Sequence, residues 1–175
     1  IDTIFKTAER ERRFAFTLPY AQIPVAIYTH ASIGGIVDLA TLHGFLVGVK
    51  AGDACVEVLA DAGIHSVQPF SSYEALVQGA IAGRVRVFCL DEPPANYLLY
   101  RNGADEGFNK AFTLYTGEFH RAVNAGDDAT LALVERGFAS ITPGEEKILR
   151  DKWMGTPLLR SPYVRYLAYA LVLGA

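Results

Sequence analysis

Short apolar runs alternate with amphipathic segments along most of the chain. Runs rich in apolar and β-branched residues predict strands at residues 24–29, 46–49, 66–70, 85–90, 111–114 and 118–123. Helices are predicted over residues 53–62, 71–82, 127–139 and 142–153, and after the pair Pro93-Pro94. This alternation of strands and helices predicts an α/β fold in which the strands pair mainly in parallel.

Four of the predicted helices begin with a residue type that caps helix N-termini, and for the helix over residues 127–139 it is Asp127 or Asp128. Asp53 precedes the first of them, and its side chain can accept a hydrogen bond from a backbone amide of the first turn. Ser71 with Glu74, and Thr142 with Glu145, have the spacing of a capping box. These caps predict where the helices start.

The composition describes a folded domain with no nucleic-acid surface. The chain has 175 residues, of which 51% are apolar, so it can bury a sizeable core as one domain or two small lobes. A net charge of −3, with no basic stripe, argues against nucleic acid as a partner. The four histidines lack metal-ligand spacing and no phosphate- or dinucleotide-binding glycine motif occurs, so we predict neither metal nor cofactor.

The two cysteines leave the redox compartment open. Cys55 lies in a predicted helix and Cys89 in a predicted strand, and we interpret them as buried free thiols. An intradomain disulfide is the alternative if the domain is exported.

The most informative stretch is residues 7–20, Thr-Ala-Glu-Arg-Glu-Arg-Arg-Phe-Ala-Phe-Thr-Leu-Pro-Tyr. It places arginines beside a half-buried aromatic strand, where a guanidinium can hold a small carboxylate through two hydrogen bonds. For any single arginine, a solvated charged turn is the alternative. The stretch resembles the T-x-E-R-x-x-x-F-x-F-(S/T)-x-P-Y signature of the family 3 solute-binding proteins, which capture amino acids and similar small polar solutes outside the cytoplasm.

The resemblance continues over about residues 1–156. Residues 39–50 are similar to the D-L-x-G-x-x-V-G-V segment of the family, and residues 71–83 resemble its helix ending in A-x-G. Arg86 stands where the family usually has an aspartate, and Trp153 is similar to the family's terminal K-W. The order and spacing of these pieces carry the resemblance together.

The resemblance implies an α/β, periplasmic-binding-protein-like (type II) two-lobe fold. The first lobe is expected to comprise residues 1–40 and 117–157 and to be incomplete at its N-terminus. The second lobe is expected to comprise residues 41–116, with the ligand between the lobes. Residues 158–175 are expected to form a linker and the start of a transmembrane helix, because the final residues are apolar and follow interfacial tyrosines. An ordinary helix packed on the domain is the alternative.

The resemblance also implies two charged ligand contacts. Arg10 is expected to bind the ligand carboxylate, and Asp91, at a strand end, is expected to bind an ammonium group. A helix cap is the alternative role for Asp91, and Glu92 is a weaker candidate beside it. Ligands in open α/β sheets bind beyond the carboxyl ends of the strands, which is where Asp91 falls.

Further positions around the expected cleft depart from the family. Asp53 and Ala54 belong to the turn whose backbone amides can hold an anion. Ala54 replaces a common Ser or Thr, and Asp53 would repel a carboxylate, so an ordinary L-amino-acid ligand is in doubt. Thr3 and Phe5 match positions that line the cleft, although Phe5 replaces a small polar residue.

These expectations favour an extracytoplasmic sensor domain that binds a small polar solute, an amino acid or a related carboxylate. It would be anchored at the outer face of a bacterial inner membrane and pass its signal to a histidine kinase or diguanylate cyclase module, in a full-length receptor compatible with a homodimer. The alternative is the substrate-binding subunit of an amino-acid ABC importer. A cyclohexadienyl-dehydratase-like enzyme ranks lower, and we predict no catalysis by this domain.

Overall fold

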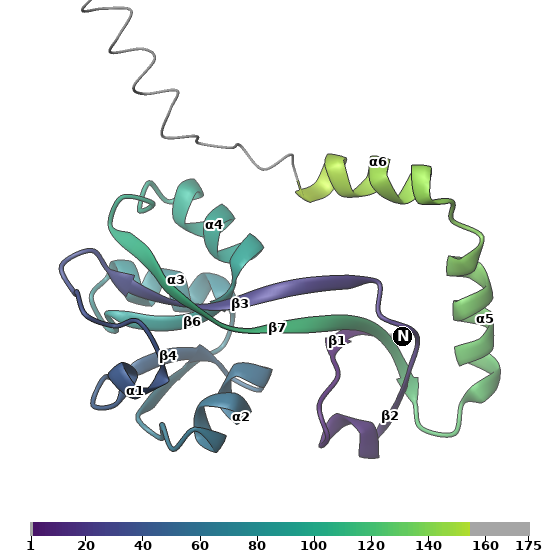
Figure 1. Cartoon of the computed structure of the whole chain (residues 1–175), viewed down its shortest axis with the longest axis horizontal. Helices are drawn as coiled ribbons and strands as arrows, with labels where there is room; N and C mark the ends of the chain where they lie inside the picture. Colours follow the sequence, from purple (N-terminus) through teal and green to yellow (C-terminus); the bar gives the residue numbers. More distant parts are fainter. Residues whose placement is uncertain (1, 155–175) are drawn as a thin grey trace, which may run out of the picture. The chain divides into compact units, whose positions relative to one another are not determined.

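A mixed β-sheet is the framework of the computed structural model, which describes residues 2–154 (Figure 1). Its strands are β1 (Asp2–Phe5), β2 (Phe14–Phe16), β3 (Ala21–His30), β4 (Val47–Lys50), β5 (Val67–Phe70), β6 (Val87–Asp91) and β7 (Phe108–Asn124). The helices are η1 (Arg10–Arg12), α1 (Leu39–Leu42), α2 (Ala54–Asp61), α3 (Tyr73–Ile81), α4 (Glu92–Arg101), α5 (Asp128–Ala139) and α6 (Pro143–Met154). The chain forms two compact units, Ile1–Phe138 and Ala139–Ala175, and the whole sheet belongs to the first.

The strand order is β1-β7-β3-β6-β4-β5, and β2 also pairs with β7. Among the strands of residues 2–154, only the β4–β5 and β4–β6 pairs are parallel, whereas β7 is antiparallel to β1, β2 and β3, and β3 is antiparallel to β6. The prediction of mainly parallel pairing was therefore wrong. The reason is that two long strands, β3 and β7, run against their neighbours through the middle of the sheet.

Helices cover both faces of the sheet around β3 and β6. Alternate residues of these strands, such as Val25 and Cys89, pack with α2, while their neighbours Ala26 and Leu90 pack with α3 and α4. This two-sided burial explains why the run of residues 85–90 is continuously apolar instead of alternating. Figure 1 shows α3 and α4 on one side of the strands and α1 and α2 on the other.

Most predicted elements before residue 101 are confirmed within a few positions. Asp53 caps α2 through the amide of Cys55, and prolines occupy the first turn of α4. For α3 the cap is Ser72, which accepts from Ala75, instead of the predicted Ser71. The helix begins one residue later than the capping-box spacing indicated.

The prediction of two separate strands between residues 111 and 123 needs correction. Residues 111–114 and 118–123 were expected to be separate strands, but both belong to the single strand β7. Of the three residues between them, Tyr115 and Thr116 stay in the β3 ladder opposite Val25 and Pro24, and Gly117 lies opposite Ile23. Gly117 continues the strand, and its lack of a side chain leaves the space in which the Phe5 ring packs.

Cys55 and Cys89 form a disulfide, which corrects the interpretation of two free thiols. Their Cα atoms are 6.6 Å apart, and both residues are 2% exposed. A helix and a strand that are distant in sequence bring the sulfur atoms together across one face of the sheet. Sequence spacing gave no means of measuring that approach.

Helix α6 belongs to the second compact unit. Thr142 and Glu145 form the predicted capping box, because the Glu145 carboxylate accepts from the Thr142 amide at 2.9 Å and the Thr142 hydroxyl accepts from the Glu145 amide. No helix among residues 2–154 has the length and apolar character needed to cross a bilayer. The predicted linker and membrane segment at 158–175 lie outside the described residues.

The division into two lobes at residues 40–41 and 116–117 stays a prediction. One relevant fact is that β3, which lies within the expected first lobe, pairs with β6 as well as with β7.

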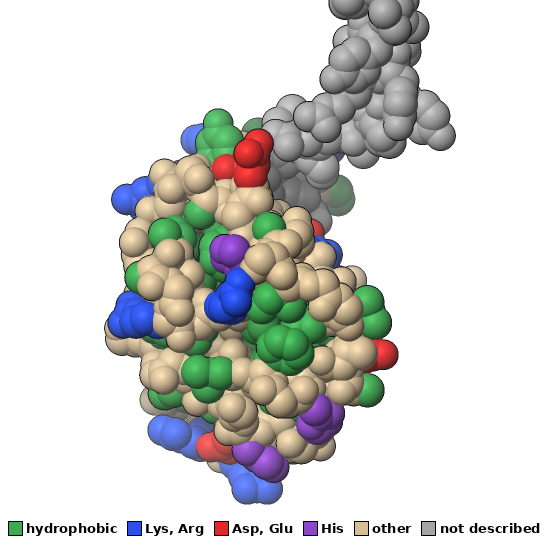
Figure 2. Space-filling model, turned by 90° about the vertical axis from the view of Figure 1, so that its left-hand side faces the viewer, with side chains coloured by type: hydrophobic (Ala, Val, Ile, Leu, Met, Phe, Trp, Pro, Cys, Tyr) green, Lys and Arg blue, Asp and Glu red, His purple; other side chains and the backbone are tan. Residues whose placement is uncertain are grey.

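Some large apolar side chains remain exposed, among them Val37 and Leu46. Figure 2 shows hydrophobic side chains at the surface beside Lys, Arg and His side chains.

Replacing Gly48 with alanine tests the packing of the sheet. A Cβ atom at this position in β4 would lie 2.7 Å from Leu76 Cδ1 and 2.9 Å from Val85 Cγ2. Such overpacking should lower the free energy of unfolding by about 1–3 kcal/mol in urea titrations. The control is Gly34→Ala, which meets no atom within 4 Å and should change stability by less than about 0.5 kcal/mol. Equal effects of the two substitutions would contradict the described packing.

Candidate functional site

A cavity of about 780 Å³ opens where β1 ends and the edge of β7 is left without a strand partner. Residues between Phe5 and Glu11 line it, together with Ala54 and Val58 of α2. Residues of β7, among them Tyr115, also line it. A volume of this size is typical of sites for small molecules.

A charged cluster lies near this cavity, at the carboxyl ends of the parallel strands. Lys50 ends β4, Asp53 follows in the turn before α2, and Asp91 ends β6. Tyr73 begins α3, three residues after the end of β5 at Phe70. Parallel strands place their carboxyl ends at one edge of a sheet, which explains how residues far apart in sequence meet here.

The Tyr73 hydroxyl lies between the two carboxylates. Its oxygen is 2.8 Å from Asp53 Oδ2 and 3.3 Å from Asp91 Oδ2. Because one hydroxyl has one proton, it donates to one carboxylate at a time. The Lys50 ammonium group lies 5.8 Å from the centroid of the Tyr73 ring.

Asp91 is held in an unfavourable setting for a charge. The residue is only 4% exposed. Burial raises the pKa of Asp91 to about 6, and the neighbouring Asp53 carboxylate adds to the rise, while Tyr73 and Lys50 oppose it. Asp91 occupies the N-cap position of α4, yet its side chain makes no capping hydrogen bond. The helix-cap alternative therefore does not account for this carboxylate.

Tyr115 connects the cavity with the charged cluster. It lines the cavity, and its hydroxyl is buried without a hydrogen-bond partner among the described residues. Burial, together with the nearby Asp53 and Asp91 carboxylates, raises the pKa of Tyr115, and the Arg10 guanidinium opposes that rise. The tyrosine is thus protonated near neutral pH and has a hydrogen-bond donor to offer.

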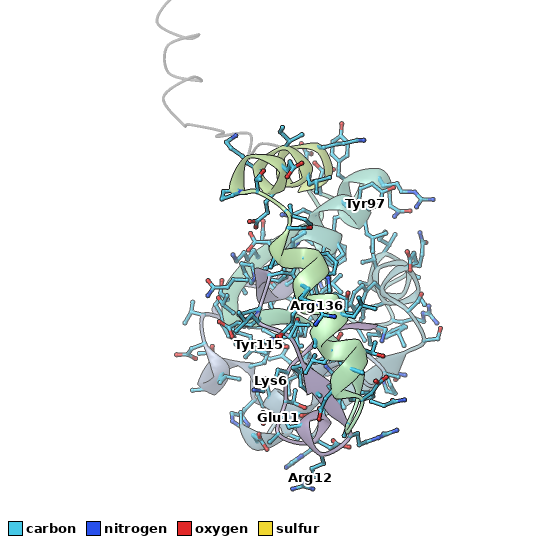
Figure 3. All side chains as sticks on the ribbon, turned by 90° about the vertical axis from the view of Figure 1, so that its right-hand side faces the viewer. Lys6, Glu11, Arg12, Tyr97, Tyr115 and Arg136 are labelled. Atoms are coloured by element: carbon cyan, nitrogen blue, oxygen red, sulfur yellow. A yellow bond between two sulfur atoms is a disulfide. The ribbon has the colours of Figure 1, made fainter. Side chains whose placement is uncertain are left out.

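Arg10 reaches from the start of η1 to the turn before α2. Its Nη1 donates to the carbonyl of Phe5 at 2.9 Å, and its Nη2 donates to the carbonyl of Gly52 at 3.0 Å. The guanidinium therefore joins two backbone oxygens from segments that are far apart in the sequence. Arg12 is exposed and points away from the molecule (Figure 3).

The other predicted site residues differ in their placement. Phe5 and Ala54 line the cavity, and both are buried. Asp53 is half-buried, and its second oxygen accepts from the Cys55 amide at 3.1 Å. Thr3 is exposed, lies opposite Arg121 in the β1–β7 ladder and is not among the residues that line the cavity.

The weaker candidate, Glu92, is engaged elsewhere. Its carboxylate forms an ion pair with Lys110 at 2.7 Å. Lys6 and Glu11 form another ion pair, also at 2.7 Å, at the wall of the cavity, and Figure 3 shows both side chains on the same part of the molecule as Tyr115.

Sequence reasoning missed Tyr73, Tyr115 and Lys50. Tyr73 follows its cap as any helical tyrosine would, and Lys50 reads as an ordinary strand end. Tyr115 fell between two predicted strands and was given no role. The one available signal is that Lys50 directly follows a predicted strand, as Asp91 does, and that Tyr73 lies three residues after another.

His120 is a further buried polar residue beside the cavity. It is 5% exposed, and its Nδ1 lies 2.8 Å from the carbonyl oxygen of Thr17, so Nδ1 carries a proton. Its Nε2 has no hydrogen-bond partner among the described residues and lies 3.7 Å from the Glu118 carboxylate. Within residues 2–154, no three His, Cys, Asp or Glu side chains are grouped to hold a metal ion.

Comparison with known proteins identifies the fold. No protein-family model matches the chain, and no curated protein sequence matches it. Among solved structures, a histidine kinase sensor domain with similarity to periplasmic binding proteins has a TM-score of 0.81 at 22% identity, covering 87% of this chain and 68% of that chain. A mutant of ArgBP from T. maritima has a TM-score of 0.77 at 20% identity, covering 89% and 70%.

The periplasmic domain of BvgS from B. pertussis is also similar. Its TM-score is 0.74 at 18% identity, and the match covers 97% of this chain but 34% of that longer chain. The chain thus has a periplasmic-binding-protein-like α/β fold, and the matches confirm the fold expected from the sequence. This fold is shared by solute-binding proteins and by periplasmic sensor domains.

The substitution Asp91→Asn should make stability less dependent on pH. Because the pKa of Asp91 is raised to about 6 in the folded protein and is near 3.9 in an unfolded chain, its ionisation costs stability as pH rises from about 4 to 6. At pH 7.5 the free energy of unfolding of the variant, measured by urea titration, should therefore exceed that of the parent by up to about 3 kcal/mol. At pH 4 this difference should disappear. Asp61→Asn, at an exposed position, is the control. An advantage of equal size at both pH values would refute the assignment.

Proposed function

We propose that the chain is the extracytoplasmic sensor domain of a membrane signalling protein and binds a small polar solute, an amino acid or a related compound. The observation that carries the proposal is the meeting of opposite charges beside a cavity of suitable size. The Arg10 cation contacts the turn before α2, at Gly52. The Asp53 and Asp91 carboxylates lie at the carboxyl ends of β4 and β6, around the Tyr73 hydroxyl. A zwitterionic solute needs both a cation and an anion from its binding site.

The described contacts suggest how binding would proceed. Arg10 is bound to the carbonyls of Phe5 and Gly52. A ligand carboxylate would replace at least one of these carbonyls, because a charge-assisted bond to a guanidinium is stronger than one to a neutral acceptor. The Tyr115 hydroxyl, which lacks a partner among the described residues, would gain one at the same time.

The buried disulfide and the similarity to periplasmic sensor domains support an extracytoplasmic location. The proposal assigns the domain a binding role and no catalytic step. The substrate-binding subunit of an importer is the second candidate, because arginine-binding proteins share the fold. The two candidates bind the same class of solute and differ in their attachment to the membrane.

Arginine and glutamine are the first probes to test. One similar structure is an ancestral arginine-binding protein bound to glutamine, and others are ArgBP with arginine. Isothermal titration of the natural full-length binding domain with L-arginine, L-glutamine, the remaining amino acids and then related small carboxylates should give saturable heat for at least one of them. Absence of binding across this panel would refute the proposed function.

Replacing Arg10 with alanine should weaken binding of the identified ligand by at least about 100-fold, because two charge-assisted bonds are lost. The melting temperature should change little, since a partly exposed arginine contributes little to the core. Arg12→Ala, two residues away and exposed, is the matched control and should bind as the parent does. If the Arg12 variant loses affinity while the Arg10 variant keeps it, the assignment is wrong.

Replacing Asp91 with asparagine should distinguish ligands by their amino group. An amine-bearing ligand should lose roughly tenfold or more in affinity, whereas its deaminated analogue should lose little, because only the amine interacts with the carboxylate charge. Calorimetry with both compounds on both proteins gives the comparison. Equal losses would show that Asp91 does not contact the amine.

Membrane attachment separates the two candidate functions. Residues 163–175 are apolar after Arg165, and the sensor proposal expects the natural protein to be anchored through this segment. Fractionation of cells that express the full-length protein should recover it with the inner membrane, resistant to extraction with high salt. Recovery in the soluble periplasmic fraction would favour the importer subunit.

A further inference from the structure

The disulfide joins two chain segments, each of which carries one of the acidic site residues. Cys55 follows Asp53 by two residues at the start of α2, and Cys89 precedes Asp91 by two residues in β6. The cysteines are 34 residues apart in sequence and are both buried. A single covalent bond therefore joins the backbone segments that present the two carboxylates.

Each acidic residue lies two positions from its cysteine in the same helix start or strand. Asp53 Oδ1 accepts a hydrogen bond from the Cys55 amide at 3.1 Å, which ties the Asp53 side chain to the first turn of α2. Cys89 and Asp91 are two positions apart in a strand, so their side chains leave the same face of the sheet. Movement of α2 away from β6 would thus separate the carboxylates directly.

The noncovalent forces at this point do not all favour the close approach. Asp53 and Asp91 carry like charges when both are ionised, and the Tyr73 hydroxyl can donate to only one of them at a time. Lys50 from β4 is the nearby cation, and the Tyr115 hydroxyl from β7 faces the same charges. A covalent link holds the two segments together whatever the protonation state of the acids.

We propose that the Cys55–Cys89 disulfide is a positioning element of the ligand site, which keeps the Asp53 and Asp91 carboxylates together around the Tyr73 hydroxyl so that they act as one acceptor pair. In giving that pair a role, the inference rests on the proposed binding function. A disulfide that closes a loop stabilises a fold whatever lies beside it. The experiment must therefore measure the carboxylates themselves.

The test is a double-mutant cycle read by NMR. The carbon signal of the Asp91 carboxyl group, assigned through its loss in Asp91→Asn, is followed from pH 3 to 9. In the disulfide-bonded protein Asp91 should titrate near its raised pKa of about 6. Asp53→Asn should lower this midpoint by about one pH unit, since it removes a like charge from the pair.

The same cycle is then measured without the disulfide. The double variant Cys55→Ala with Cys89→Val keeps much of the buried apolar volume, which limits the effect of a cavity. In this background the Asp91 midpoint should already be lower by about one unit, and Asp53→Asn should shift it little further. Protein refolded in a thiol reductant, which converts the disulfide into two thiols, should behave like the double variant, and reoxidation should restore the midpoint.

Two results would overturn the proposal. If Asp53→Asn shifts the Asp91 midpoint equally with and without the disulfide, the carboxylates stay together unaided and the disulfide is only a staple. If neither the double variant nor the reduced protein unfolds cooperatively, the bond is a requirement of the fold instead of a positioning element. No ligand is needed in this cycle, so failure of every amino acid and related carboxylate to bind would refute the proposed function without deciding this inference.

Discussion

The pairing of β3 with β7 is the constraint on which the rest of the structure depends. The two strands are antiparallel from the Ala21–Phe119 pair to the His30–Phe108 pair, and they connect β1 and β2 on one side with β6, β4 and β5 on the other. The register shifts beside Ile27 bend the ladder locally. Because β1 is short and pairs with β7 from Phe119 to Ala122, the edge of β7 before Phe119 is left open on that side, and the cavity lies there. The position of the candidate site thus follows from strand length.

The electrostatics of the site follow from a different feature, the parallel strands β4, β5 and β6. Their carboxyl ends converge, and each strand leads to a helix with a polar N-cap residue, which is Asp53, Ser72 or Asp91. Desolvation makes this convergence costly for Asp91, whose pKa rises because the charged form is disfavoured. Natural proteins retain such costs mainly where a ligand or reaction uses them. On the proposed function, a cation from the ligand would offset the cost of ionising Asp91.

The sequence was sufficient for features determined by neighbours in the chain. The helix after Asp53 and the capping box at Thr142 were predictable because a cap and its amide are only a few residues apart. Strand direction was not predictable from periodicity, because parallel and antiparallel strands buried on both faces look alike. The disulfide and the contact of Tyr73 with Asp91 were not predictable either, because both join segments that are distant in sequence and meet only in the folded sheet. The resemblance provided the fold that periodicity could not.

The turn before α2 shows how a local departure can change what a site recognises. Asp53 uses one oxygen to accept from the Cys55 amide, so an amide at this helix start is already engaged, and Ala54 offers no hydroxyl. On the proposed function, this end of α2 therefore presents a negative charge to the ligand, and the carboxylate contact depends on Arg10. A solute with its cationic group toward Asp53 and Asp91 suits this arrangement better than one with a carboxylate there. Specificity would then come from repulsion at Asp53 as much as from attraction at Arg10.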